Sequence, residues 1–282
     1  MASIRDIRRR IRGVQNMEKI TKAMKMVAAS RLRKCQERVV AARPYTHQMH
    51  EILARLAQDQ AEASHPLLEK RPVQTVGYVV ITSDRGLAGG YNANIIRMTK
   101  NLLAEEAHDA KIVMVGRKGR DIFRHGKVEM ISEFVNIGDF PSYTLAKDIA
   151  QQVMRFYREG TFDEVYLVYN EFISAISQVP KQVKILPLEQ PEGQSGGKEY
   201  IFEPSPKEIM DTLLPKYVET MVFRTLLEGK ASEMGAKMTA MGAATDNAKD
   251  LIDNLTLQMN RARQAAITKE ISEIVGGAAA LE

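Results

Sequence analysis

The segment Thr82–Asn92, which reads TSDRGLAGGYN, carries the residues best placed to do chemistry. It follows an apolar run and precedes a helical pattern, so an anion bound there would meet the N-terminus of a helix. Its glycines lack the G-x-G-x-x-G spacing of a dinucleotide site, and the sequence has no G-x-x-x-x-G-K-[ST] phosphate loop. We therefore interpret the segment as a structural or contact loop, with a nucleotide site as the alternative.

Candidate metal ligands and nucleophiles are few. His47 and His50 lie three residues apart on a predicted helix, but no carboxylate or cysteine pattern accompanies them, so we interpret them as surface residues. Cys35 is the only cysteine, which excludes an intrachain disulfide and a cysteine-based metal site. The sequence thus predicts no catalytic residue, no metal and no cofactor, and we expect no active site within the chain.

Positive charge is concentrated at the N-terminal end of the chain. Residues 1–43 contain 13 Lys or Arg and three acids, a net charge of +10, whereas the whole chain has a net charge of +5. A basic arm on a mildly acidic body is typical of proteins that bind nucleic acid, an anionic membrane face or an acidic protein partner. A solvated helix face is the alternative.

The N-terminal arm has the pattern of a long helix. From about Ser3 to the early sixties, apolar residues recur at helical spacing, beginning with Ile4, Ile7 and Ile11. Pro44 should kink this helix or end it, with a helical pattern resuming afterwards.

The C-terminal segment has the clearest pattern in the sequence. A helix opened by Pro206, with Pro215 bending its first turns, continues as an apolar seam whose spacings alternate between four and three residues. Such a heptad pattern predicts a left-handed coiled coil, which the Gly276–Gly277 pair should end. The predicted seam positions are Leu227, Ala231, Met234, Met238, Met241, Thr245, Ala248, Ile252, Leu255, Met259, Ala262 and Ala266.

The middle of the chain alternates short β-rich runs with helical patterns, which favours a layered α/β domain with a largely parallel sheet. The predicted strands are 76–81, 111–115 and 164–169, with 179–186 as a further edge strand. The predicted helices are 93–107, 119–125 and 143–158.

Two long terminal helices can bury each other's seams. We therefore predict an antiparallel two-helix coiled coil from the chain ends, with a central Rossmann-like α/β domain. The expected segments are an N-terminal coiled-coil helix over residues 1–65, the α/β domain over 73–190 and a C-terminal coiled-coil helix over 206–282.

Four segments resemble the gamma subunit family of rotary F-type ATP synthases. They are Val14–Ser30 (VQNMEKITKAMKMVAAS), Thr82–Asn92, Ala243–Asn247 (AATDN) and Ala262–Ala278 (ARQAAITKEISEIVGGA). They occur in the family's order and cover both ends and the middle of the chain.

The resemblance implies a rotor shaft. In that family the terminal helices stand inside a ring of three alpha and three beta subunits, and the α/β domain forms a foot with the epsilon subunit on the membrane ring of c subunits. Rotation of the shaft couples ion translocation to ATP synthesis or hydrolysis, while nucleotide binds in the surrounding ring.

The resemblance also implies roles for individual positions. Contacts that couple the shaft to the beta subunits are expected at Met24, Lys25, Arg85, Gly89, Lys237, Arg263, Gln264, Thr268 and Glu270. Contacts of the foot with epsilon and the c ring are expected at Tyr200, Phe202 and Glu203. Where relatives carry arginine at the position of Lys237, lysine loses the planar bidentate fork.

Two other classes of protein remain as alternatives. A basic coiled-coil protein that binds nucleic acid would use residues 1–43 against phosphates, although this arm has no aromatic residue before Tyr45 on which a base could stack. An enzyme built on the α/β domain is the other. We expect the chain to be peripheral to the membrane, on the cytoplasmic face of a bacterial plasma membrane, and not to bind nucleic acid.

Overall fold

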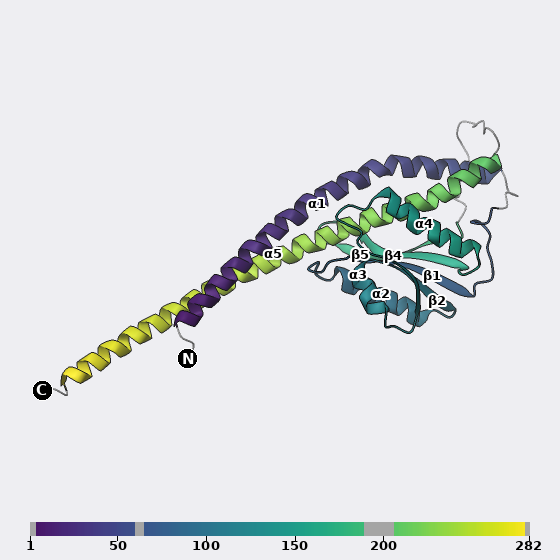
Figure 1. The fold of residues 1–282 in the computed structure, drawn as a ribbon. Helices are drawn as coiled ribbons and strands as arrows, with labels where there is room; N and C mark the ends of the chain where they lie inside the picture. The colour runs from purple at the N-terminus through teal and green to yellow at the C-terminus, as the bar shows by residue number, and fades with distance from the viewer. Residues whose placement is uncertain (1–3, 60–64, 189–205, 280–282) are drawn as a thin grey trace. The chain divides into compact units, whose positions relative to one another are not determined.

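The computed structural model describes residues 4–59, 65–188 and 206–279 (Figure 1). Two long helices, α1 (Ile4–Asp59) and α5 (Pro206–Ala279), lie at the ends of the chain, and an α/β domain lies between them in sequence. The elements of that domain are β1 (Thr75–Ile81), α2 (Tyr91–Glu105), β2 (Asp109–Val115), α3 (Arg117–Phe123), β3 (Glu129–Phe134), α4 (Tyr143–Arg158), β4 (Glu164–Phe172) and β5 (Gln178–Leu186).

The strands form one mixed sheet in the order β3-β2-β1-β4-β5. The first four strands are parallel, and β5 pairs antiparallel with β4 at the edge, as expected for residues 179–186. Strand β3 is absent from the prediction because none of its residues is buried, so its sequence has no continuous apolar run. The predicted Rossmann-like α/β arrangement is therefore confirmed, with one strand more than expected.

Side chains that alternate along the central strands point into two apolar layers, one on each face of the sheet. Val79 and Ile81 face the layer that contains α4, α5 and part of α1, whereas Tyr78 and Val80 face the layer that contains α2. Each of these four side chains is at most 3% exposed, because both faces of the sheet are covered by helices.

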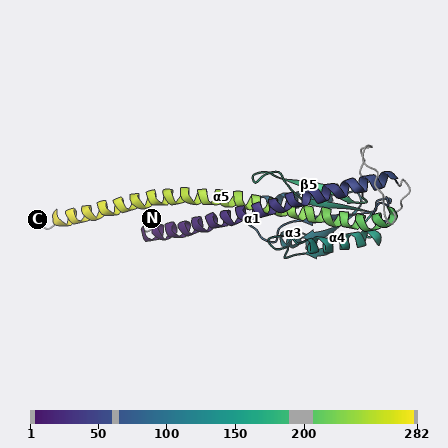
Figure 2. The same cartoon turned by 90° about the horizontal axis from the view of Figure 1, so that it is seen from above.

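The described residues fall into two compact units. Residues up to Val27 and from Met238 onward form the first unit, and residues Ala28–Lys237 form the second, so α1 and α5 each contribute to both. Within the first unit, Figures 1 and 2 show α1 and α5 side by side and running in opposite directions.

The first unit consists of the predicted antiparallel helix pair. Ile7 and Ile11 of α1 form a buried cluster with Leu255 of α5. The Thr245 hydroxyl donates a hydrogen bond of 2.8 Å to the Thr21 hydroxyl across the seam. Because the earlier α1 residues meet the later α5 residues, these contacts place the two helices antiparallel.

Of the predicted helix boundaries, the end at Gly276–Gly277 is wrong, because α5 extends to Ala279. Helix α1 continues through Pro44 to Asp59, and α5 continues through Pro215 and Gly276 to Ala279. A proline removes one backbone hydrogen bond, and long flanking stretches packed on a neighbour supply enough compensation to keep a helix continuous. The division into residues 1–65, 73–190 and 206–282 stays a prediction. In the ranges 4–59, 65–188 and 206–279, no helix is both long and apolar enough to cross a bilayer.

Candidate functional site

The loop after β1 is held by a single carboxylate. Asp84 accepts hydrogen bonds from the backbone N–H groups of Arg117 (3.1 Å), Asn136 (3.1 Å) and Ile137 (2.7 Å). These donors follow β2 and β3, so Asp84 joins the loops at the carboxyl ends of three neighbouring strands. The residue is half-buried and fully occupied by internal donors.

The two residues before Asp84 are also hydrogen-bonded within the chain. The Ser83 hydroxyl donates to the carbonyl of Arg85 at 2.6 Å, and the Ser83 N–H donates to Asn92 Oδ1 at 3.0 Å. Thr82 Oγ1 accepts from the N–H of Gly119 at 3.0 Å. Gly116 completes this arrangement. Its φ is +100°, and a Cβ at this position would clash with the Thr82 carbonyl oxygen, so only glycine fits.

The crest of the same loop faces outward. Arg85, Leu87 and Gly89 are exposed, and the Leu87 side chain keeps 63% of its surface accessible. Leu87 and Gly89 both have positive φ, 63° and 52°, the left-handed region that a leucine rarely adopts. A rigid base that presents a strained, exposed apolar residue is suited to contacting a partner.

Helix α5 fills the place where a doubly wound sheet usually binds its ligand. That place lies at the carboxyl ends of the strands where the strand order reverses, here between β1 and β4. A Cβ on Gly229 of α5 would lie 3.4 Å from Ile81 and from the Tyr91 hydroxyl. The Ser232 hydroxyl donates to the Asn170 carbonyl at 2.9 Å. The position is thus occupied by the chain's own helix, which favours the contact-loop interpretation of Thr82–Asn92.

Helix α1 is fixed at the same edge of the sheet by the loop after β3. Arg31 forms an ion pair of 2.6 Å with Asp139, and the Arg38 guanidinium lies 4.5 Å from the centre of the Phe140 ring. The tip between β4 and β5 approaches α5 as well, because a Cβ on Gly235 would lie 3.3 Å from the backbone of Ala175.

We call these contacts together the helix socket. It is formed by the loops after β1 and β3 and by the end of β4 with its hairpin, which hold α1 near residues 31–38 and α5 near residues 229–235. All of it lies within the second unit. A polar and close-packed junction of this kind joins the α/β domain firmly to both helices.

A buried group of charges on α5 belongs to the socket. Glu233 lies between Lys230, at 2.8 Å, and Lys237, at 3.5 Å, and the three side chains are 5%, 11% and 12% exposed. We call these residues the α5 triad. Lys237, for which the resemblance implies a contact with a partner, therefore has its ammonium group paired inside the chain.

Cys35 and the histidines provide no metal site that the structure displays. Cys35 is buried, and burial raises the pKa of its thiol to about 11. The side chains of His47 and His50 fall outside the described residues. Over the described ranges, no three histidine, cysteine or acidic side chains converge as metal ligands do.

The other expected coupling residues lie on the first unit. Met24 is half-buried, and Lys25 is exposed with its ammonium group 3.5 Å from the position of a Cβ on Gly242. Four further expected contacts are exposed on α5: Arg263, Gln264, Thr268 and Glu270. The structure thus places the expected positions in both units, on accessible surface except for Met24 and Lys237.

Beyond Ala266, the last predicted seam position, α5 carries an exposed apolar stripe. Its members are spaced four, three and one residue apart and are 49–71% exposed: Ile267, Ile271, Ile274 and Val275. A stripe of this spacing lies on one face of a helix, so it is suited to an apolar surface outside the chain.

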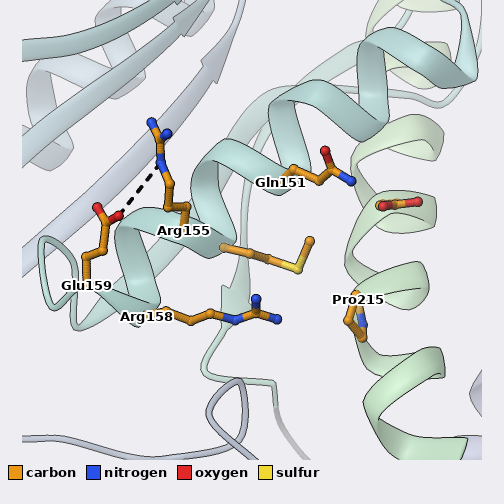
Figure 3. Close-up of a pocket in the computed structure, with 7 residues that line it drawn as sticks. Gln151, Arg155, Arg158, Glu159 and Pro215 are labelled. Carbon is orange, nitrogen blue, oxygen red and sulfur yellow. Dashed lines mark ion pairs between the residues drawn. The ribbon is translucent and has the colours of Figure 1, made fainter.

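The expected foot contacts Tyr200, Phe202 and Glu203 lie outside the described residues. Elsewhere in the second unit, a cavity of about 580 Å³ opens between α4 and α5 (Figure 3). Its carboxylates are engaged, because Glu159 lies 4.0 Å from Arg155 and Glu219 accepts a 2.8 Å hydrogen bond from Tyr143.

Sequence reasoning missed most of the socket residues. Asp84 had a local signal, since a short acidic residue directly after a strand often caps the backbone of a turn. Arg31 and Asp139 are 108 residues apart, and nothing in the sequence pairs them. The same holds for Ser232 with Asn170.

Comparison with known proteins places the chain in a family. The model of the family described as ATP synthase matches residues 3–281. The chain is 72% identical to the ATP synthase gamma chain of Desulfitobacterium hafniense and 53% identical to that of Moorella thermoacetica, and each match covers all of both chains.

Solved structures give the same result. The chain is similar to a chain in the central stalk and c-ring structure of the Tetrahymena thermophila mitochondrial ATP synthase, with 30% identity and a TM-score of 0.62, over 80% of this chain and 99% of that one. A chain of the Euglena gracilis mitochondrial ATP synthase, at 20% identity, shares the fold with a TM-score of 0.67 over 99% of this chain and 94% of that one. The chain therefore belongs to the gamma chain family of ATP synthases.

Proposed function

We propose that this chain is the central rotor shaft of a bacterial F-type ATP synthase. It transmits rotation between a membrane ring of c subunits and a catalytic ring of three alpha and three beta subunits, and so couples ion translocation to ATP synthesis or hydrolysis. The observation that carries this proposal is the antiparallel pairing of the chain's two ends, with the α/β domain joined to the same two helices by the helix socket.

The first unit supplies the surface that would turn against the beta subunits. Lys25, Arg263 and Glu270 are exposed, and the whole α1 arm is strongly basic, which is complementary to an acidic segment of a partner. The exposed stripe from Ile267 to Val275 fits an apolar sleeve in the ring better than it fits water.

The second unit would contribute the loop crest and the foot. Arg85 and Gly89 present an exposed surface on a rigid base, which supports a contact with the beta subunits at this loop. Tyr200, Phe202 and Glu203 are the positions proposed for contacts with the epsilon subunit and the c ring, on the resemblance alone.

Location follows from the proposed partners. The family's members belong to membrane-associated complexes, and we place this chain on the cytoplasmic face of the bacterial plasma membrane as a peripheral subunit. Neither the relatives nor the solved structures give support to the nucleic-acid-binding alternative.

Reconstitution tests the proposal directly. The chain is co-expressed with alpha and beta subunits of the same organism, and the purified material is examined for a complex of three, three and one. We expect that complex to form and to hydrolyse ATP. Recovery of the chain alone, with alpha and beta unassembled, would contradict the proposal.

A further inference from the structure

The α5 triad is a buried ionic group on a long helix. Lys230 Nζ lies 2.8 Å from one carboxylate oxygen of Glu233, and Lys237 Nζ lies 3.5 Å from the other. Both oxygens of Glu233 are therefore used, and none of the three side chains is more than 12% exposed. A lysine that turned toward a partner subunit would have to leave this position.

Groups from two other elements face the triad. Burial is the main cause of the raised pKa of the Cys35 thiol on α1, while Lys230 lowers this pKa and Glu233 raises it, so Cys35 lies within electrostatic reach of both. Tyr91, at the start of α2, has its pKa raised first by burial and then by Glu233. The triad thus lies in the helix socket, where α5 meets both α1 and the α/β domain.

We propose that Lys237 acts inside the chain, as a positioning residue for Glu233, and not as a direct contact of a beta subunit. Together with Lys230 it holds the Glu233 carboxylate, and the paired group fixes α5 about its own axis in the helix socket. The effect of this position on coupling rests on the proposed function, whereas the ion-pair network itself belongs to the isolated chain.

The network predicts that removing the charge of Lys237 changes the stability of the chain in opposite directions in the native chain and in a chain that lacks the charge of Glu233. Removing the charge of Lys237 from the native chain leaves Glu233 with one lysine instead of two, which is unfavourable. Removing the charge of Glu233 takes away the carboxylate that Lys230 and Lys237 both contact, which is more unfavourable. In that second background, removing Lys237 relieves a like-charge repulsion and is favourable.

Thermal unfolding of the full-length isolated chain tests this prediction. Lys237→Met should lower the unfolding midpoint by ~2–4 °C in the native chain. It should raise the midpoint when introduced into a Glu233→Met chain. Lys100→Met, at an exposed position of α2, serves as the matched control and should leave the midpoint unchanged.

Each outcome decides between the two roles. A midpoint unaffected by Lys237→Met, or an equal loss in both backgrounds, would overturn the proposal. If Glu233→Met does not fold but Glu233→Met with Lys237→Met does, the change of sign is confirmed in a stronger form. If neither folds, the proposal is wrong.

The assembled complex separates positioning from direct contact. Protons pumped per ATP hydrolysed should fall with Lys237→Met, be retained with Lys237→Arg, and be higher in the double variant than with Glu233→Met alone. A direct contact of Lys237 with a beta subunit would make the double variant no better than the single one. If the native chain does not assemble at all, the proposed function fails while the unfolding result for the isolated chain still stands.

Discussion

At the scale of single residues, Asp84 illustrates how one side chain orders a contact surface. Its carboxylate accepts three backbone N–H groups from the loops after β2 and β3. The exposed residues Arg85, Leu87 and Gly89 follow closely in sequence. The surface that a partner would meet is therefore set by a residue that the partner does not touch.

Replacing Asp84 by alanine should lower the free energy of unfolding by about 1–3 kcal/mol, because three backbone N–H groups lose their hydrogen bonds to a charged carboxylate. Urea unfolding of the isolated chain measures this loss. Asp246→Ala is the control, since the Asp246 side chain is 72% exposed and its pair with Lys249 is a surface pair. Equal stability of the two variants would show that Asp84 does not hold the loops.

His65 should make stability depend on pH. Its Nδ1 accepts the N–H of Leu67 at 3.1 Å, which requires the neutral ring, and burial lowers its pKa from the ordinary 6.5. The unfolded chain therefore takes up a proton near pH 6.5 that the folded chain still resists. Stability is retained above that pH and falls as the pH drops from 6.5 toward the lower folded pKa.

The measurement compares urea unfolding of the native chain and of His65→Gln, whose side chain keeps an acceptor for Leu67. Between about pH 7.5 and about pH 5.5 the native chain should lose more stability than the variant. Carboxylates titrate in both chains, so the difference isolates the histidine. The same loss in both chains would assign the pH dependence to other groups.

At the scale of elements, sequence periodicity predicted the helix pair well and the socket poorly. All twelve predicted seam positions, from Leu227 to Ala266, are buried or half-buried, because a heptad pattern reports one face of one helix. The half-exposed strand β3 and the continuation of α1 through Pro44 depend on neighbours far away in sequence. So does the α5 triad, in which Lys237, expected to contact a beta subunit, pairs with Glu233.

The approach of α5 to the hairpin between β4 and β5 gives a prediction at this scale. Gly235→Val should destabilise the chain by about 1–3 kcal/mol, because its side chain would enter the space of the Ala175 backbone. Gly13→Val on α1 meets nothing within 4 Å and should change stability by less than about 0.5 kcal/mol. Chemical denaturation of both variants decides, and similar losses at the two positions would contradict the packing argument.

At the scale of the whole molecule, the proposed role requires more energy than surface charges transmit. One charge that crosses 100 mV delivers about 2.3 kcal/mol, and several charges are needed for each ATP. An exposed ion pair contributes about 0–1 kcal/mol. Rotation would therefore be transmitted by steric contact along the helix pair, with the basic arm assisting docking.

Neutralising Lys22 and Lys25 together tests that division of roles. Both are exposed on α1, so Lys22→Gln with Lys25→Gln should leave most ATP synthesis intact in an assembled complex, with slower assembly than the native chain at low salt, where the native charges are least screened. Synthesis is measured in vesicles under an imposed proton gradient. Loss of synthesis with normal assembly would assign the coupling to these charges.

The central claim is that the two ends of the chain turn as one body. Thr21→Cys with Thr245→Cys places two thiols where the native hydroxyl oxygens are 2.8 Å apart, so a disulfide can join α1 to α5. Cys35 can stay in place, because its buried thiol has a pKa of about 11 and forms little thiolate.

In the assembled complex, ATP hydrolysis and ATP-driven proton pumping are measured before oxidation, after oxidation and after reduction. The account predicts that the cross-linked complex keeps both activities, because the disulfide joins two parts that already move together. Loss of activity on oxidation, restored by reduction, would show that α1 and α5 must move relative to each other, and would contradict a shaft formed by both helices.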